Sequence, residues 1–490
     1  MPKPPNILWF CTDQQRFDTI SALGNSEINT PNLDAFCTQG WAFTSAYVQS
    51  PICTPSRASM LTGRYPASHH VMRNGASEFP ASEELVSGVL ADAGYRCGLV
   101  GKLHLSAQSK GEKRPQNDGF SYFDWNPQPA YQGGPNGYTD WLEEKGIDHA
   151  ELFADRTTFC GAGVPAEHHQ TTWAGERAKE FIAEDSDKPW FLMVNVFDPH
   201  PPFDPPAEYL NRYNPQNLRP PAYRDSDQAN QEFLSNTPFQ TRKPLDVFGP
   251  TPDRNGSGAD PSRPGQVAAK PPQSFDGRAV KAAYYAMIEL IDDVFGSLLK
   301  HLEHLGQDGE TLVIFTSDHG EMLGDHGLLY KGCRFYDQLV RVPLIIRKPG
   351  SVVAGTTSDA LVESIDIAAT ILDCADVQAP PRMQGRSFWP LIQGNGDPHE
   401  FRPSVTAEYN DTLAHFEPEH GSMVFDGTYK TCVYENHGLL EVYNLKEDPG
   451  EFNNLVLSGI EPELKSDLLE RHLQRWLSTS DAGLPRTQAN

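Results

Sequence analysis

The segment Ser50-Pro-Ile-Cys-Thr-Pro-Ser-Arg-Ala-Ser-Met-Leu-Thr-Gly-Arg64 is the most informative stretch of this 490-residue chain. Cys53 lies between Pro51 and Pro55, which stiffen the turn, and Arg57 follows one helical turn later. We expect a helix to follow this turn. The start of a helix and a guanidinium both favour an anionic oxygen or a thiolate. The segment therefore predicts an anion-binding environment around Cys53, whereas most cysteines of such a chain are small buried hydrophobes.

Three short apolar runs are followed directly by polar residues of types that bind ligands or act in catalysis. Short apolar runs bounded by loops are typical of buried strands in a parallel sheet. Ligands bind beyond the carboxyl ends of strands in open α/β sheets, so the three runs predict one shared site. The runs are Ile7–Cys11, followed by Asp13 and Gln14; Phe191–Phe197, followed by Asp198 and His200; and Leu312–Phe315, followed by Asp318 and His319.

Helix-like segments lie between these strands. The longest spans about residues 278–304 and has apolar residues on one face. A shorter helix is expected over about residues 82–93, ending at Gly94. We interpret Asp292 and Asp293 as part of the solvated side of the long helix. Strands that alternate with helices predict an α/β fold with a mixed sheet.

The sequence pattern changes towards the end of the chain. We predict a catalytic α/β domain over residues 1–397 and a small α+β subdomain over residues 398–490. Short alternating stretches around an Asp426-Gly427 turn predict an antiparallel sheet there, followed by a helix over about residues 461–477. Residues 199–275 are rich in Pro, Asn, Asp and Gly, so we expect a long surface excursion at the rim of the site.

Composition narrows the class of protein. Acidic residues outnumber Lys and Arg by 65 to 40, and the formal net charge of -25 repels nucleic-acid backbones. No apolar run approaches the ~18 residues needed to span a membrane, and Met1–Phe10 lacks the apolar region of a secretory signal. We therefore expect a cytoplasmic protein without nucleic-acid or membrane partners. The eight cysteines contain no C-x-x-C pair, which argues against a disulfide framework or a zinc ribbon.

The segment around Cys53 resembles the signature of the formylglycine-dependent (type I) sulfatases, C-x-P-S-R followed by x-x-x-L-T-G-R, with every fixed position present. The resemblance extends from Asn6 to about Leu455 and points to the branch of choline-sulfatases, arylsulfatases and phosphonate monoester hydrolases. It implies the fold of the alkaline phosphatase superfamily, a large mixed sheet between helices with a small C-terminal antiparallel sheet and helix. It also implies that a formylglycine-generating enzyme oxidises Cys53, whose hydrated aldehyde then offers a geminal diol as nucleophile.

The resemblance also implies roles for individual residues. The implied ligands of a divalent metal, Ca²⁺ first and Mn²⁺ or another divalent ion as the alternative, are Asp13, Gln14, Cys53, Asp318 and His319. The implied catalytic residues are Cys53, Arg57, Lys102, His104, His200 and Lys331, and Asn74 is implied to bind substrate. Gln14 and His319 stand where many relatives have Asp and Asn, and an imidazole suits manganese, zinc or iron better than calcium. His200 would protonate the leaving alkoxide while the cations neutralise charge on the transferring group.

Three functions follow as hypotheses. The first is a sulfuric ester hydrolase that cleaves an aryl, alkyl or sugar sulfate. The second keeps the same site but acts on phosphonate monoesters or phosphodiesters, whose tetrahedral shape and charge are similar. The third is a catalytically silent metal or anion binder with an unmodified Cys53. The alcohol part of the substrate is not indicated, and a homo-oligomer that buries the C-terminal subdomain is an open alternative.

Overall fold

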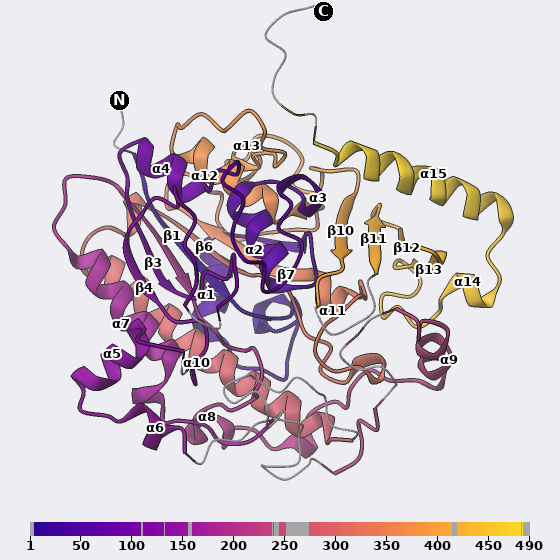
Figure 1. The fold of residues 1–490 in the computed structure, drawn as a ribbon, viewed down its shortest axis with the longest axis horizontal. Helices are drawn as coiled ribbons and strands as arrows, with labels where there is room; N and C mark the ends of the chain where they lie inside the picture. Colours follow the sequence, from indigo (N-terminus) through magenta and orange to yellow (C-terminus); the bar gives the residue numbers. More distant parts are fainter. Residues whose placement is uncertain are drawn as a thin grey trace, which may run out of the picture.

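A nine-stranded sheet forms the centre of the structure, in the order β4-β3-β5-β1-β6-β7-β2-β8, with β9 also paired to β2 (Figure 1). The structure is a computed structural model that describes residues 4–108, 111–131, 133–154, 159–237, 239, 245–250, 274–413, 419–481 and 483. The strands are β1 (Asn6–Thr12), β2 (Trp41–Tyr47), β3 (Arg96–Gly101), β4 (Phe120–Trp125), β5 (Trp190–Asn195), β6 (Thr311–Ser317), β7 (Arg341–Arg347), β8 (Thr356–Ser358) and β9 (Val362–Glu363). Strand β7 is antiparallel to β6 and β2, and the other pairs are parallel, so the predicted mixed sheet is confirmed.

The three strands predicted from the apolar runs are neighbours at the middle of this sheet. β1 pairs in parallel with β5 on one side and β6 on the other, with Cys11 opposite both Asn195 and Thr316. All three strands are buried along their whole length, because apolar side chains occupy both faces. Their carboxyl ends therefore meet at one edge of the sheet, which holds the predicted site.

Helices cover both faces of the sheet. Ile7 and Trp9 of β1 pack in a core with α2, α4 and α12, whereas Leu8 and Phe10 pack in a second core with α1, α7 and α10. The helices of the large domain are α1 (Pro31–Gln39), α2 (Cys53–Thr62), α3 (Pro66–His69), α4 (Val86–Asp92), α5 (Gly137–Glu144), α6 (His149–Leu152), α7 (Gln170–Ala183), α8 (Ala207–Leu210), α9 (Asp225–Phe233), α10 (Gly277–His304), α11 (Asp337–Val340), α12 (Ile365–Cys374) and α13 (Trp389–Ile392). Short 3-10 turns are η1 (Ser21–Leu23), η2 (Ala166–His168), η3 (Pro215–Asn217), η4 (Asp308–Glu310) and η5 (Asp325–Gly327).

Among the described residues, no helix has the length and apolar character that crossing a membrane requires.

The long helix α10 confirms the predicted segment, but one of its residues was misinterpreted. Asp292 is buried, and its carboxylate accepts hydrogen bonds from the backbone amides of Asn32 (3.1 Å) and Leu33 (2.7 Å). These two amides belong to the first turn of helix α1, and the side chain of the N-cap residue Thr30 makes no capping hydrogen bond. The interpretation of Asp292 as a solvated residue is therefore wrong. The Asp292 carboxylate, which belongs to α10, accepts hydrogen bonds from backbone amides at the start of α1 that have no partner within their own helix. Asp293 is exposed, as expected.

The C-terminal region forms the predicted small antiparallel sheet. Its strands are β10 (Val405–Asn410), β11 (His420–Phe425), β12 (Tyr429–Tyr434) and β13 (Gly438–Asn444), in that order, followed by α14 (Leu455–Ser458) and α15 (Pro462–Ser478). Leu468 of α15 is buried against Leu439 and Val442 of β13. The described part of the predicted excursion at residues 199–275 includes α8, η3 and α9, whereas residues 238, 240–244 and 251–273 lie outside the described residues. The boundary between the two predicted domains stays a prediction.

Lys430 of β12 links the small sheet to the large domain through a fully buried ion pair network. Its ammonium donates to Asp337 Oδ1 (2.5 Å), Glu451 Oε1 (2.7 Å) and the carbonyl oxygen of Phe335 (3.1 Å). Removing one partner of a buried ion pair leaves an uncompensated charge inside the protein.

Lys430→Met is therefore expected to lower the free energy of unfolding by about 3–5 kcal/mol. Denaturant titration followed by circular dichroism measures this. Lys465→Met, at an exposed position of α15, is the matched control and should change the free energy by less than about 0.5 kcal/mol. Equal effects of the two variants would contradict the assigned role of Lys430.

Candidate active site

Cys53 is the first residue of helix α2, whose ten residues are all buried. The helix ends at Gly63, which has a left-handed φ of 64° and donates its amide to Ser59 O at 2.9 Å. A left-handed helix end favours glycine. Asn74, predicted to bind substrate, lies beside Cys53, since its Oδ1 accepts a hydrogen bond from the amide of Thr54 at 3.1 Å. The start of α2 thus presents Cys53 to the edge where the central strands end.

Four of the five predicted metal ligands, Cys53 among them, lie close together. One ligand atom each from Asp13, Cys53, Asp318 and His319 lies within 4.8 Å of the others, and all four residues are buried. Asp13 follows β1, whereas Asp318 and His319 follow β6. The Asp13 amide donates to the Asp198 carbonyl at 3.1 Å, and the Asp318 amide donates to the Thr12 carbonyl at 3.2 Å. These backbone hydrogen bonds hold the ends of β1, β5 and β6 together.

Gln14 completes the predicted ligand set from a backbone position with a φ of 72°. Its amide nitrogen Nε2 donates to Glu321 Oε2, and its Oε1 accepts from Lys331 Nζ at 2.8 Å. The Glu321 carboxylate can only accept a hydrogen bond and the Lys331 ammonium can only donate one. The NH₂ group of the Gln14 side chain therefore faces Glu321, and its oxygen faces Lys331. Glu321 also accepts hydrogen bonds from the amides of Leu323 (3.2 Å) and Tyr330 (2.5 Å). Sequence reasoning missed Glu321, although it lies three residues after Asp318.

Three cations surround the two carboxylates of this cluster. Arg57 Nε donates to Asp318 Oδ2 (2.8 Å) and Arg57 Nη2 to Asp13 Oδ2 (3.3 Å). Lys102 Nζ donates to Asp13 Oδ2 at 2.5 Å. Burial alone would raise the pKa of Asp13, but Lys102 foremost among its positive neighbours holds that pKa well below the usual range. Arg57 and Lys102, both predicted for catalysis, therefore contact the carboxylates of the cluster. The third predicted cation, Lys331, lies on the side of Cys53.

The thiol of Cys53 lies within reach of an ammonium and an imidazole. Its sulfur is 2.9 Å from Lys331 Nζ and 3.1 Å from His319 Nε2. Burial raises the pKa of the thiol, yet Lys331, Lys102 and His319 outweigh burial and the Asp13 charge, which gives a pKa of about 7. A nucleophilic group at position 53 is thus placed where the protein stabilises negative charge.

The surroundings of the two predicted catalytic histidines favour the neutral imidazole, because they lower the pKa of both side chains. Burial lowers the pKa of His104 well below its ordinary value, and Lys102 and Arg57 lower it further. Burial and then Lys331 do the same to the pKa of His200. His200 Nδ1 lies 2.8 Å from the Pro201 carbonyl, an acceptor, so this nitrogen carries the hydrogen. Proton donation from the other nitrogen of His200 therefore needs a bound anion, whose charge raises the imidazole pKa.

Glu112 holds the loop that carries Lys102 and His104. Its Oε2 accepts from the His104 amide at 2.9 Å and from Trp125 Nε1 at 3.0 Å. Its Oε1 accepts from the amides of the next two residues, Leu105 and Ser106. The carboxylate thus fixes three consecutive amides at a turn where His104 has a φ of 59°. Sequence reasoning missed this residue, because no pattern around Glu112 connects it to the loop.

Glu112→Gln is expected to lower kcat/KM about tenfold to a hundredfold, because it places an NH₂ group against backbone donors and displaces His104. Steady-state kinetics measure the effect. Glu78→Gln, at an exposed residue paired with Lys113, is the control and should retain full activity. If the Glu112 variant has unchanged kinetics, Glu112 does not position the loop for catalysis.

The donor set fits a divalent cation. Two carboxylates, an amide oxygen and an imidazole nitrogen line the cluster, and oxygen-rich sets of this kind bind hard divalent ions. The orientation of Gln14 supports this fit, since Glu321 turns the amide nitrogen away and leaves the oxygen facing the cluster.

Comparisons with known proteins agree with the fold and the site. Residues 5–377 match the sulfatase family, and residues 324–477 match the C-terminal region of N-sulphoglucosamine sulphohydrolase. An arylsulfatase of Clostridium perfringens is 28% identical over 494 residues, which cover 98% of this chain and 95% of that protein. The multifunctional alkaline phosphatase superfamily protein PehA of Trinickia caryophylli is 28% identical over 520 residues, covering 98% and 96%. The solved structure of a phosphonate monoester hydrolase of Agrobacterium radiobacter superposes with a TM-score of 0.79 and 25% identity, covering 98% of this chain and 97% of that one.

The fold and the buried site define a hydrolase of the alkaline phosphatase superfamily. The chain belongs to the sulfatase family, whose match spans most of its length. It is an enzyme of the sulfuric ester hydrolase class, and the family and fold predicted from the Cys53 segment are confirmed. The roles of the individual site residues stay predictions.

Proposed function

We propose that this enzyme hydrolyses a sulfate monoester through a formylglycine made from Cys53. The observation that carries the proposal is the placement of Cys53 Sγ, 2.9 Å from Lys331 Nζ and 3.1 Å from His319 Nε2, at the centre of the buried cluster. The carbon that bears this sulfur would carry the aldehyde. A geminal diol at this place would have cations on one side and the Asp13 and Asp318 carboxylates on the other.

In the proposed reaction one diol hydroxyl, whose proton has passed to water, forms a bond to sulfur through its oxygen while the bond between sulfur and the leaving alcohol oxygen breaks. The alkoxide takes a proton from His200, once the bound sulfate has raised the pKa of that imidazole. The second diol hydroxyl then gives its proton to the neutral imidazole of His104, the carbon–oxygen bond to the sulfate breaks with its electron pair leaving on the sulfate, and the aldehyde re-forms. Water adds to the aldehyde and restores the diol. Lys102, Lys331 and Arg57 stabilise the negative charge on the transferring group throughout.

A divalent metal fits the same proposal. Asp13, Gln14, Asp318 and His319 would hold it, together with an oxygen on residue 53. Bound there, the ion supplies positive charge that favours the ionised form of the nucleophile. Ca²⁺ is our first candidate because most of the donors are oxygens, and the His319 nitrogen makes Mn²⁺ or another divalent ion the alternative.

The proposal includes a partner, a formylglycine-generating enzyme. Cys53 is 2% exposed and the whole of α2 is buried, so the thiol is inaccessible to a second protein in the folded chain. We therefore expect the oxidation of Cys53 to precede folding. A cytoplasmic location and self-association stay predictions from the sequence.

The second candidate reaction is the hydrolysis of phosphonate monoesters or phosphodiesters. The structural similarity to the phosphonate monoester hydrolase of Agrobacterium radiobacter favours it. Singly charged tetrahedral esters of phosphorus and sulfur would meet the same cations, so the site geometry admits both.

Matched esters test the proposed preference. We expect kcat/KM for 4-nitrophenyl sulfate to exceed that for 4-nitrophenyl phenylphosphonate, because the chain matches the sulfatase family. The leaving group is identical in the two esters, so the comparison reports on the transferred group. The release of 4-nitrophenol measures both reactions. The reverse ranking would make the phosphorus ester the primary substrate.

A further inference from the structure

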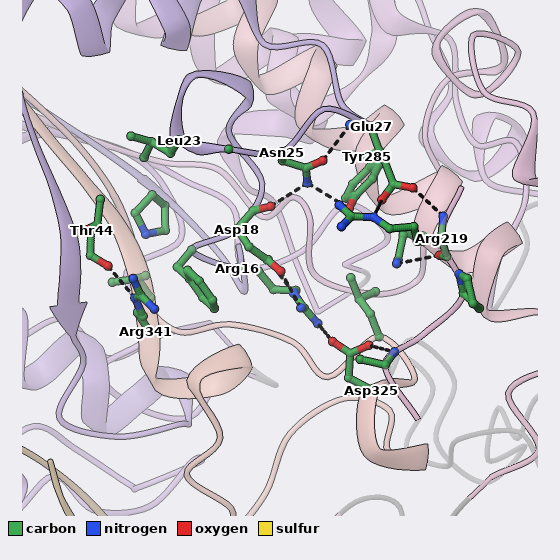
Figure 2. Close-up of a pocket in the computed structure, with 18 of the residues that line it drawn as sticks. Arg16, Asp18, Leu23, Asn25, Glu27, Thr44, Arg219, Tyr285, Asp325 and Arg341 are labelled. Atoms are coloured by element: carbon green, nitrogen blue, oxygen red, sulfur yellow. Dashed lines mark hydrogen bonds and ion pairs between the residues drawn. The ribbon is translucent and has the colours of Figure 1, made fainter. Parts of the chain in front are cut away.

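The charged side chains around a cavity of about 390 Å³ outside the catalytic cluster interact with one another (Figure 2). Arg16 donates a hydrogen bond to Asp18 and forms an ion pair with Asp325, each at 2.8 Å. The two acidic side chains therefore share one guanidinium. Asp198, in the turn that follows strand β5, is a buried acidic residue in a different environment.

The carboxylate of Asp198 is held by uncharged side chains. Its Oδ1 accepts a hydrogen bond from Gln170 Nε2 at 3.2 Å, and its Oδ2 accepts one from Thr171 Oγ1 at 3.1 Å. Within the described part of the chain, its only ion-pair contact is to His169 Nε2, 3.6 Å from Oδ2. A buried carboxylate without a cation is costly, so these hydrogen bonds have to compensate for its lost hydration. Asp198 is thus bound to three consecutive residues of another segment.

These three residues form the start of helix α7. His169 is the N-cap residue, and Gln170 and Thr171 are the first two residues of the helix. His169 Nδ1 accepts a hydrogen bond from the Thr171 amide at 3.2 Å, so its Nε2 carries the hydrogen and faces the carboxylate. Further along α7, Trp173 and Phe181 are buried in the core on one face of the central sheet. The start of α7 is therefore a well-anchored point, and its helix dipole favours a carboxylate there.

The turn that contains Asp198 also carries His200. The His200 amide donates to the Phe197 carbonyl at 3.1 Å, which closes the turn, and the centres of the two rings lie 4.6 Å apart. The backbone carbonyl of Asp198 accepts a hydrogen bond from the Asp13 amide at 3.1 Å. The turn is thus held on two sides, by its backbone against the end of β1 and by the Asp198 side chain against the start of α7.

We propose that Asp198 is a positioning residue, which holds the turn at residues 197–200 against α7 and thereby fixes the imidazole of His200 where it protonates the leaving alkoxide. The inference rests on the proposed function, in which His200 is that proton donor. Asp198 itself does not touch the reacting atoms. Without its carboxylate, the turn keeps the backbone hydrogen bond to Asp13 but loses both hydrogen bonds to α7. A displacement of about 1 Å at a reacting group costs about a hundredfold in rate, so this link affects catalysis from a distance.

Two aryl sulfates distinguish this role from a general loss of structure. Phenolate is a more basic leaving group than 4-nitrophenolate, so its departure depends more strongly on a proton donor. We expect Asp198→Ala to lower kcat/KM for phenyl sulfate at least about tenfold more than for 4-nitrophenyl sulfate. His200→Ala should show the same dependence on the leaving group to a larger extent. Release of the two phenols measures both reactions.

Milder variants keep the test valid if Asp198→Ala fails to fold, which circular dichroism checks. Asp198→Asn should stay within about threefold of the unaltered enzyme on both esters, because its oxygen accepts from Gln170 and its NH₂ group donates to the Thr171 hydroxyl. Thr171→Val removes one donor to the carboxylate and should give the Asp198→Ala pattern more weakly. Asp187→Ala, at an exposed position before β5, is the matched control and should hydrolyse both esters like the unaltered enzyme.

A double variant tests whether Asp198 acts through His200. In the His200→Ala background, Asp198→Ala should lower kcat/KM for phenyl sulfate no further, because the group that it positions is absent. Equal losses on the two esters in Asp198→Ala, or a full additional loss in the double variant, would overturn the inference and leave the proposed function in place. If His200→Ala itself affected both esters equally, the proton donor of the proposed function would be wrong, and the inference would fall with it.

Discussion

Cys53→Ala is expected to lower kcat for sulfate ester hydrolysis by at least about 10⁴-fold, because no other group takes the place of the nucleophile. Cys53 is buried, and alanine fits in its space, so the fold should be retained. Product release with a chromogenic sulfate measures the loss, and circular dichroism checks the fold.

The matched control is Cys53→Ser, which keeps a hydroxyl but removes the second one of the diol. Serine is expected to accept the sulfuryl group once and then stall, since no second hydroxyl is left to expel it. A burst of at most one product per chain would appear, without turnover. Full steady-state activity in either variant would contradict nucleophilic catalysis by residue 53.

Asp318→Asn is expected to lower kcat/KM by at least about a hundredfold and to remove most of the bound divalent metal. Asp318 accepts hydrogen bonds from Arg57 Nε (2.8 Å) and from the backbone nitrogen of Gln14 (2.9 Å), so it holds both a cation and a neighbouring ligand residue in place. Elemental analysis of the purified protein gives the metal content per chain, and kinetics give the activity.

Asp92→Asn, at an exposed position of α4, is the control for this substitution and should keep both metal and activity. Treatment of the unaltered enzyme with a chelator should also abolish activity, and the ion that restores it best identifies the metal. An Asp318→Asn enzyme with full metal content and full activity would show that this carboxylate is not a ligand.

The main features of the fold, and the shared edge at which three strands end in polar residues, could be predicted because they depend on local sequence patterns, whereas the roles of individual site residues came from the resemblance to the sulfatases. The runs before Asp13, Asp198 and Asp318 are fully buried strands, and parallel pairing necessarily brings their ends together. The segment around Cys53 combines a helix start with a glycine helix end, which is visible in the sequence without any tertiary contact. The start and the end of this helix are each determined by residues only a few positions apart in the sequence.

Residues that act across long sequence separations could not be predicted in this way. Asp292 provides hydrogen-bond acceptors for α1, which precedes it by about 260 residues. Lys430 is fully buried with Asp337 and Glu451, which come from other segments. Each of these groups is polar and resembles a surface residue until the fold supplies its partner.

The mass of the proteolytic peptide that carries Cys53 tests the central claim most directly. The protein is produced in a host that contains a formylglycine-generating enzyme and is digested without reducing the aldehyde. We predict the mass of the aldehyde or its hydrate at position 53 in place of the thiol. An intact thiol in catalytically active protein would contradict the formylglycine mechanism, and an intact thiol in inactive, metal-bound protein would support a silent metal and anion binder.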